Sequence, residues 1–327
     1  MALERVAVIG AGAWGTALAQ AAAMAGREAL VIGRDPQVVA DIAENHRNSR
    51  SLGDIALHPN LTASRNNDVS GADFVIMAVP AQATRMALAG LDLAGRPVVL
   101  SAKGFETGTL KRQSEILAEA APGAIPYVLS GPSFAADVAA GRPTAVTLAG
   151  RDPAATDALA AALAGPSFRP YATGDLVGVE LAGGLKNVYA LACGAVEGAG
   201  LGASARSALL ARAYAEMARI VAALGGEAAT LTGLAGLGDL TLSCTSTQSR
   251  NYRFGVRLGA GESRDAILAS GLGLAEGVAT APAALHLAEK LTIDAPLLGA
   301  VEQLLAGRAG IAEIVGGLMA RPLKRED

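Results

Sequence analysis

The sequence predicts an α/β protein in which an N-terminal, doubly wound parallel sheet is followed by a mostly α-helical C-terminal domain. Short apolar runs alternate with helical patterns through the first half of the chain, which is typical of a parallel sheet covered by helices on both faces. No clear strand pattern follows Thr173-Gly174, and 327 residues suit about two domains. We therefore expect domains at residues 1–174 and 175–327.

The strands of the first domain are expected to be apolar along their length and to be separated by helices. Residues 74–79, for example, are strongly apolar and end at Pro80. Strands are predicted at 5–9, 28–32, 74–79, 97–101, 126–129 and 145–148. Helices are predicted at 16–25, 36–45 and 110–121.

Helical spacing of apolar residues dominates the second domain. Asp175 suits the N-cap of a helix that continues through Lys186 towards Glu197. An irregular stretch is expected over 231–251. Further helices are predicted at 205–224, 263–270, 276–290 and 296–306.

Composition and charge exclude several classes of protein. Hydrophobic residues make up 51% of the chain and charged residues 17%, which excludes a disordered chain. A net charge of -3 and an aromatic content of 3% argue against nucleic-acid binding, which needs clustered Lys and Arg or stacking platforms. Apolar stretches are interrupted before they reach about 18 residues, so no membrane span is predicted.

Cysteines and histidines give no sign of a disulfide framework or a metal site. Cys193 and Cys244 are far apart in the sequence, and the histidines lack the spacing of metal ligands. The chain opens directly into a strand and shows no signal-peptide pattern. We therefore expect a cytoplasmic protein without a metal.

The glycines of the segment VAVIGAGAWGTALA predict a dinucleotide-binding turn of the Rossmann type. Gly10, Gly12 and Gly15 have the G-x-G-x-x-G spacing, after a strand and before a helix. Gly10 would permit the tight turn, Gly12 the approach of a pyrophosphate, and Gly15 close packing of helix on strand. The free N–H groups at the start of the helix would bind the phosphates.

The end of the second strand bears on the choice between NAD and NADP. An acidic residue there usually binds the ribose 2′-hydroxyl, whereas an arginine accommodates a 2′-phosphate. The sequence at this point is Gly33-Arg34-Asp35. Arg34 favours NADP, and Asp35 leaves NAD open.

Polar residues and glycines follow other strands of the predicted sheet. Ligands in such sheets bind beyond the carboxyl ends of the strands. Lys103 follows one strand, and Gly131 and Ser133 follow another, where a helix begins. We expect a cation and a set of hydrogen-bond donors at the mouth of the site.

A glycine pair marks the first helix of the second domain. Each of Gly183 and Gly184 destabilises a helix by about 1 kcal/mol relative to alanine, so close approach to a ligand or to another backbone should offset that loss. Lys186 and Asn187 follow directly. A lysine in such an apolar setting can serve as a general acid or base.

A second polar segment lies further along the chain. Asp239 is flanked by glycine and apolar residues, and Ser249-Arg250-Asn251 comes shortly after it. Arginine with serine and asparagine suits a phosphate monoester dianion. The segment therefore predicts a phosphate-binding loop.

Six motifs, in order along the chain, resemble bacterial NAD(P)-dependent glycerol-3-phosphate dehydrogenases. They are VIGAGAWGTALA, SAKGFE, LSGPSFA, GGLKNV, AGLGDL and SRNYRFG. The resemblance extends from Val6 to Leu305. It implies interconversion of dihydroxyacetone phosphate and sn-glycerol 3-phosphate with NADP or NAD, a reaction that supplies glycerol 3-phosphate for phospholipid synthesis.

The resemblance also implies roles for individual residues. Lys186 would be the acid/base residue, oriented or tuned by Asp239, and Lys103 would orient the substrate. Cofactor contacts are expected at Gly10, Gly12, Ala13, Trp14, Gly15, Arg34, Lys103, Ala135, Arg250, Leu274 and Glu276. Substrate contacts are expected at Lys103, Gly131, Ser133, Lys186, Asn187, Asp239, Ser249, Arg250 and Asn251.

Two other functions fit parts of the same pattern. One is another lysine-dependent dehydrogenase of the hydroxyacid or 6-phosphogluconate type, although the lysine of those enzymes is typically followed by an asparagine some residues later, whereas Asn187 is adjacent to Lys186. The other is a regulator that binds NADP without turnover. The apolar helices of the second domain make a homodimer plausible.

Overall fold

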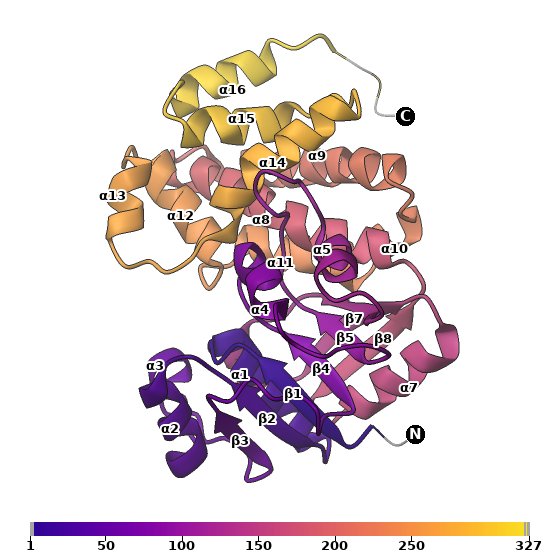
Figure 1. Cartoon of the computed structure of the whole chain (residues 1–327). Helices are drawn as coiled ribbons and strands as arrows, with labels where there is room; N and C mark the ends of the chain where they lie inside the picture. Colours follow the sequence, from indigo (N-terminus) through magenta and orange to yellow (C-terminus); the bar gives the residue numbers. More distant parts are fainter. Residues whose placement is uncertain (1–2, 324, 326–327) are drawn as a thin grey trace. The chain divides into compact units, whose positions relative to one another are not determined.

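Two compact units make up the protein, whose computed structural model describes residues 3–323 and residue 325 (Figure 1). The first unit runs to Gly183 and also contains Leu224–Asp239. The second consists of Gly184–Ala223 and the chain from Leu240 onwards. The division falls inside helix α8 (Leu176–Gly198), and a domain boundary at Gly174 stays a prediction.

Within the described residues, the first unit is built on an eight-stranded sheet in the order β3-β2-β1-β4-β5-β6-β7-β8. All neighbours from β3 to β6 pair in parallel, and the expected doubly wound α/β class is confirmed. The strands are β1 (Arg5–Ile9), β2 (Glu28–Ile32), β3 (Leu61–Ser64), β4 (Phe74–Met77), β5 (Pro97–Leu100), β6 (Ile125–Ser130), β7 (Thr144–Gly150) and β8 (Phe168–Thr173).

Strand β7 departs from the all-parallel sheet that the sequence predicts, because it runs antiparallel to β6. The connection between the two strands contains only the five-residue helix α6 (Ala135–Ala139). At about 1.5 Å per residue that helix is far too short to carry the chain back along β6, whose residues rise about 3.3 Å each. The chain therefore turns and pairs in the opposite direction.

Strands β3 and β8, at the two edges of the sheet, are not evident from the sequence. Each pairs with only one neighbour. β3 is short and has one fully buried side chain, Leu61. β8 contains Pro170, which argues against a central strand but is tolerated at an edge, where one side of the backbone makes no ladder hydrogen bonds.

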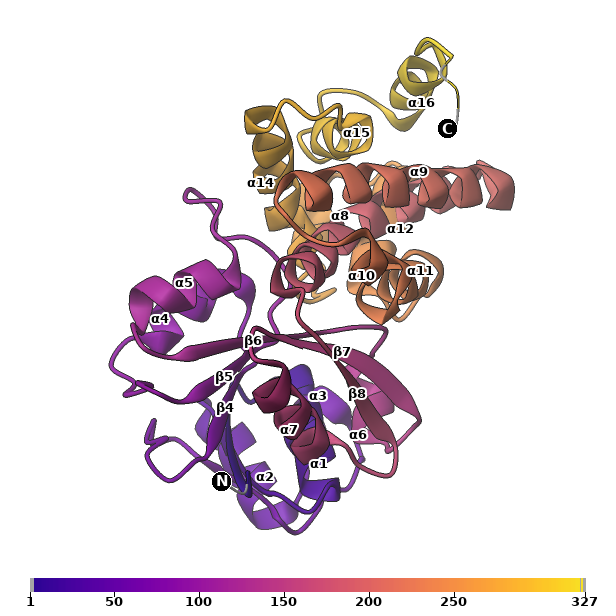
Figure 2. The same ribbon diagram turned by 90° about the vertical axis from the view of Figure 1, so that its right-hand side faces the viewer.

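Helices cover both faces of this sheet (Figure 2). Leu18 of α1 (Ala13–Met24) and Leu159 of α7 (Pro153–Leu163) are buried in the core of one face. Leu88 of α4 (Thr84–Leu88) and Ile116 of α5 (Gln113–Ala120) are buried in the core of the other face. The unit also contains α2 (Pro36–Asn45), α3 (Ser49–Leu52), a 3-10 turn η1 (Ala81–Ala83), α10 (Ala228–Thr232) and a π-helical turn η2 (Leu234–Gly238).

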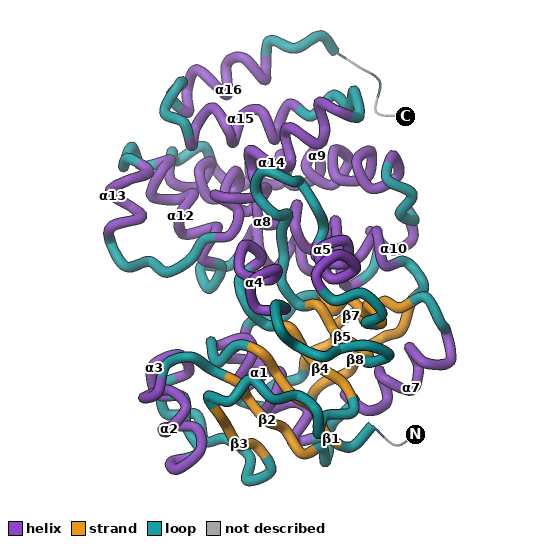
Figure 3. The backbone as a smooth tube through the Cα atoms, viewed as in Figure 1, coloured by secondary structure: helices purple, strands orange, loops and turns teal. Residues whose placement is uncertain are grey.

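The regular structure of the second unit is helical throughout its described part (Figure 3). Helix α8 is long and apolar enough to cross a membrane by length and composition, yet 94% of its most apolar window is buried within the protein, as in a core helix. The other helices are α9 (Gly202–Ala223), α11 (Asp239–Thr245), α12 (Arg250–Gly259), α13 (Arg264–Ala269), α14 (Glu276–Lys290), α15 (Pro296–Leu305) and α16 (Ile311–Met319).

The stretch 231–251 is largely helical, so the irregular loop expected from the sequence is wrong. Its glycines suggested a loop, but they serve close packing. A Cβ on Gly236 would overlap the backbone of Leu231 in the preceding helix. Small residues are therefore required where η2 folds against α10, and the chain then continues directly into α11 at Asp239.

Helices α8 and α12 touch backbone to backbone through two pairs of glycines spaced four residues apart. A Cβ on Gly194 or Gly198 of α8 would overlap a backbone oxygen of α12. A Cβ on Gly255 or Gly259 of α12 would overlap a backbone oxygen of α8. Because helices with ordinary side chains pack about 8–10 Å apart, this contact requires glycine at all four positions. It fixes the second half of α12 against the C-terminal half of α8.

Candidate active site

The turn between β1 and α1 has the geometry that a dinucleotide-binding turn requires. Gly10 has a φ of +118°, and a Cβ there would lie 2.6 Å from the carbonyl oxygen of Ala78. A Cβ on Gly15 would overlap the carbonyl oxygen of Gly10. Gly12 differs, because a Cβ there would meet nothing within 4 Å. Gly10 and Gly15 thus fold the turn, and Gly12 leaves its backbone open to a ligand.

A pocket of about 640 Å³ lies beside this turn. Its lining includes Gly10, Gly12 and Arg34. Among the residues that the structure describes, no side-chain cap hydrogen bond is made at the start of helix α1. The indole N–H of Trp14, in the first turn of the helix, is buried and has no partner among the described residues. These donors and the open backbone of Gly12 fit the phosphates of a dinucleotide, which helix N-termini bind.

Asn48 anchors the glycine turn and is a residue that the sequence reasoning missed. Its side-chain amide is fully buried and donates to the carbonyl oxygen of Ala11 at 3.0 Å and to Oγ1 of Thr16 at 2.8 Å. The contact cannot be predicted from a local pattern, because Asn48 lies 37 positions after Ala11. The side chain holds the turn and the first helical turn of α1 together.

Lys103 follows β5 and forms an ion pair with Asp239, the first residue of α11. The Nζ to Oδ2 distance is 2.6 Å, and the ammonium also lies 3.4 Å from the carbonyl oxygen of Gly131. The Asp239 side chain is only 1% exposed, so its charge is compensated by this lysine. Ser133 donates from Oγ to the same Gly131 oxygen at 3.0 Å. Four residues expected in the site therefore lie together within the first unit.

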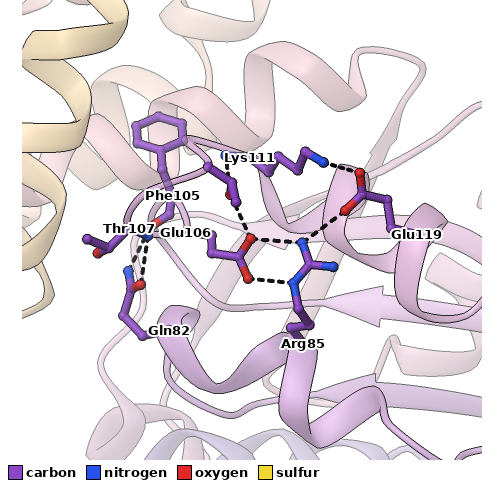
Figure 4. A network of polar contacts seen from close by, with 8 residues as sticks. Gln82, Arg85, Phe105, Glu106, Thr107, Lys111 and Glu119 are labelled. Carbon is purple, nitrogen blue, oxygen red and sulfur yellow. Dashed lines mark hydrogen bonds and ion pairs between the residues drawn. The ribbon is translucent and has the colours of Figure 1, made fainter.

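Figure 4 shows how the loop after Lys103 is held. Gln82 binds its backbone twice, donating to the Phe105 oxygen at 2.6 Å and accepting from the Thr107 N–H at 2.8 Å. Arg85 binds both carboxylate oxygens of Glu106, at 2.7 and 2.8 Å. These hydrogen bonds from Arg85 lower the pKa of Glu106 to about 2.

The same arginine extends the network to helix α5. Arg85 also donates to Glu119, which pairs with Lys111 (Figure 4). At the other end of α5, the Gln113 amide donates to the Gly104 oxygen at 2.9 Å. The loop that carries Lys103 is therefore tied to η1, α4 and α5.

The start of α5 also holds the start of α8. Glu180 accepts hydrogen bonds from the N–H and the Oγ of Ser114, at 2.8 and 2.7 Å. Its side chain is 3% exposed, and burial raises the pKa of this carboxyl even though the bonds from Ser114 oppose the rise. Glu180 thereby fixes the turn of α8 that precedes Gly183.

Lys186 and Asn187 are buried on α8 within the second unit. Lys186 is 7% exposed and donates from Nζ to Oγ of Ser243 at 2.7 Å. Asn251 donates from its amide to Oδ1 of Asn187 at 2.9 Å and accepts from the N–H of Gly277 at 2.9 Å. With its oxygen and one donor engaged in this way, Asn251 joins α8 to the start of α14.

Comparisons with known proteins agree with this geometry. Family models of the N-terminus and the C-terminus of NAD-dependent glycerol-3-phosphate dehydrogenase match residues 5–156 and 175–316. A glycerol-3-phosphate dehydrogenase (NAD(P)+) of Caulobacter vibrioides is 48% identical over 330 residues, 100% of either chain. The chain belongs to the NAD-dependent glycerol-3-phosphate dehydrogenase family. One from Brucella canis is 49% identical over 328 residues, 99% of either chain.

A solved structure of the glycerol-3-phosphate dehydrogenase family is similar over nearly the whole chain. The crystal structure of the enzyme from Coxiella burnetii superposes with a TM-score of 0.91 at 34% identity. It covers 97% of this chain and 99% of that one. The fold of the two units is therefore the fold of this family.

The remaining site residues expected from the glycerol-3-phosphate dehydrogenase motifs lie at the ends of helices. Ser249 caps α12, accepting from the N–H of Tyr252 at 3.3 Å, and Arg250 is the next residue. A Cβ on Gly273 would lie 3.4 Å from Cδ of Arg250, so Arg250 runs beside the loop before α14. Ala13, Ala135 and Glu276 are the first residues of α1, α6 and α14, and Leu274 lies two positions before Glu276.

Ser243 is a second residue that is not among the site residues expected from the sequence. It lies four positions after Asp239 on α11, and residues four apart share a face of a helix. A stretch expected to be irregular offers no helical spacing from which this placement could be predicted. A direct effect of Asp239 on Lys186 stays a prediction.

Proposed function

We propose that this protein interconverts dihydroxyacetone phosphate and sn-glycerol 3-phosphate by hydride transfer with NAD(P)H. Membership of the glycerol-3-phosphate dehydrogenase family, with relatives of the same name at 48% and 49% identity over full length, supports this function. The observation that carries the chemistry is the buried ammonium of Lys186, held by Ser243 at 2.7 Å.

The proton chemistry falls to Lys186. When bound, NAD(P)H would supply the hydride for the ketone carbon. The Lys186 ammonium gives a proton to the ketone oxygen, which leaves a neutral amine and an alcohol. In the reverse direction the neutral amine removes the hydroxyl proton. General acid help of this kind typically contributes ~10²–10⁴-fold in rate. Ser243 holds the Nζ atom, so Lys186 is placed before substrate binds.

Arg250, Asn251 and Asn187 are proposed to hold the phosphate of the substrate. The interlocked amides of Asn187 and Asn251 are buried and fixed by the N–H of Gly277. Arg250 begins the same helix as Asn251 and is exposed at its N-terminus. A guanidinium suits a phosphate dianion, and positioning of this kind lowers a barrier by several kcal/mol. Lys103, neutralised by Asp239, is proposed to orient the carbonyl end.

The cofactor is proposed to bind at the glycine turn with the pyrophosphate at the start of α1. Arg34 lines the adjoining pocket, which supports NADP over NAD. A cytoplasmic location, a role in supplying glycerol 3-phosphate for phospholipids, and a homodimer follow from the sequence reasoning and stay proposals. The family match favours this reaction over a hydroxyacid or 6-phosphogluconate type of dehydrogenase.

The test is the oxidation of NADPH and NADH by the purified protein with dihydroxyacetone phosphate. We expect turnover that is lost by at least a hundredfold in Lys186→Ala, with cofactor binding unchanged. Lys290→Ala is the control, because Lys290 is exposed at the end of α14. Binding of NADPH without turnover on any ketone would favour the regulator. Near-normal turnover in Lys186→Ala would remove the acid/base role.

A further inference from the structure

The end of β2 has no room for the acidic side chain that binds a ribose 2′-hydroxyl. The first residue after the strand is Gly33, and its N–H is bonded to the Ser64 oxygen at 3.0 Å. A Cβ there would lie 2.6 Å from Cβ of Ala11, which belongs to the glycine turn itself. A longer side chain would clash, so the position nearest the cofactor turn carries no charge.

The nearby carboxylate of Asp35 already makes hydrogen bonds and an ion pair within the protein. It caps α2, accepting from the N–H groups of Gln37 at 2.9 Å and Val38 at 3.4 Å. Its other oxygen is paired with Arg50 at 2.5 Å. The backbone hydrogen bonds lower the pKa of Asp35, so this group stays ionised and engaged with its own helix. It is poorly suited to accept from a ribose hydroxyl.

Two arginines follow the ends of neighbouring strands and line the same pocket. Arg34 follows β2, and Arg65 follows β3, its parallel neighbour, where Ile32 pairs with Ser64. The turn that begins at Arg65 is fixed by the Asn66 N–H, which donates to Oγ of Ser64 at 3.0 Å. Both arginines are exposed and line the pocket of the glycine turn.

The charges of these two arginines are not balanced within the part of the chain that the structure describes. Neither guanidinium has a hydrogen-bond or ion-pair partner there. Two like charges on adjacent strand ends repel each other unless an anion lies between them. A phosphate monoester, with nearly two negative charges, is the group that two guanidinium forks bind best.

We propose that Arg65 is a specificity-determining residue that, with Arg34, binds the 2′-phosphate of NADP(H). The inference rests on the proposed use of a nicotinamide dinucleotide and adds a second arginine, contributed by β3, to the one expected from the sequence. A carboxylate that accepts from the ribose 2′-hydroxyl is missing here, because Gly33 has no side chain and Asp35 is bonded to α2 and Arg50. Discrimination between the two cofactors therefore comes from both strands.

The test measures nucleotide binding without substrate, by calorimetry with 2′,5′-ADP and with ordinary 5′-ADP. We expect the wild type to bind 2′,5′-ADP more tightly. Arg65→Ala should lower the affinity for 2′,5′-ADP by about ten- to a hundredfold, which corresponds to the loss of one hydrogen bond to a charged group. The affinity for 5′-ADP should change by no more than about twofold. Arg65→Lys should lose less, since its charge remains. Unchanged 5′-ADP binding shows that the variant is folded.

The control is Arg151→Ala, which removes an exposed arginine of the same unit that does not line the pocket. The inference is overturned if Arg65→Ala matches Arg151→Ala, or if the wild type does not prefer 2′,5′-ADP. Both outcomes leave the proposed function standing with NADH. Conversely, Arg65-dependent binding of 2′,5′-ADP without turnover of dihydroxyacetone phosphate supports the inference and refutes the function.

Discussion

The ammonium of Lys103 and the carboxylate of Asp239 lie 2.6 Å apart, although 136 positions separate them in the sequence. Lys103 is carried by a loop that three side chains, one each from η1, α4 and α5, hold in place, and Asp239 opens α11. The pair joins the loop after β5 to Asp239 within the first unit. Two residues with expected roles in catalysis are thus positioned by each other.

Removal of the negative charge of this pair should impair both folding and catalysis. In Asp239→Asn, Lys103 loses its charged partner, and a hydrogen bond to a charged group is worth about 1.5–3 kcal/mol. We expect a fall of that size in the free energy of unfolding in urea, and a lower kcat/KM for dihydroxyacetone phosphate. Asp265→Asn, at an exposed position of α13, should change neither quantity. Equal behaviour of the two variants would contradict the role of the pair.

Arg250 is expected to act on the phosphate of the substrate rather than on its carbonyl group. Arg250→Ala should raise the KM for dihydroxyacetone phosphate by about ten- to a hundredfold, since a charge-assisted contact is lost. Turnover of an unphosphorylated analogue should hardly change. Arg253→Ala is the matched control, because Arg253 is exposed on the same helix. An equal effect of Arg250→Ala on both substrates would remove the phosphate assignment.

The glycine contact between α8 and α12 should be intolerant of a single methyl group. In Gly255→Ala the new Cβ would overlap the Leu191 oxygen, and such overpacking costs about 1–3 kcal/mol. Gly299→Ala provides the opposite case, because nothing lies within 4 Å of a Cβ there and α15 should gain up to about 1 kcal/mol. Thermal and urea unfolding of both variants measures the difference. A stability of Gly255→Ala at or above that of wild type would show that the helices are not in backbone contact.

The pair of Arg85 and Glu106 should make stability depend on pH in the acid range. The pKa of Glu106 is lowered from 4.5 to about 2 in the folded protein, so its contribution is complete above pH 4.5 and is lost as the pH falls towards 2. The urea midpoint of wild type should therefore exceed that of Glu106→Gln at pH 7, and the gap should narrow below pH 4.5. Glu44→Gln, at an exposed position, should show no such trend. A gap that stays constant down to pH 3 would argue against the pair.

Local patterns in the sequence were sufficient where one segment determines its own structure. The turn with Gly10, Gly12 and Gly15 is such a case, because its spacing alone implies strand, turn and helix. Contacts between distant segments were not accessible in this way. Asn48 on the glycine turn, Gln82 on the loop of Lys103, and Arg65 beside Arg34 are ordinary polar residues until the sheet brings them together.

Glycine and proline were each misleading in one segment. In 231–251 it suggested a loop, whereas Gly236 allows one helical turn to fold onto another. The reverse holds at β8, where Pro170 obscured a strand that lies at the edge of the sheet. In both cases the residue is explained by its neighbours in space, which no single segment contains.

The four-glycine crossing of α8 and α12 has a practical consequence for redesign. Since the two backbones meet there with no side chains between them, the separation of α8 and α12 at these glycines is set by main-chain contact. Redesign of the proposed phosphate site will therefore have to begin with the side chains around it, because any larger residue at these four glycines would force the two helices apart.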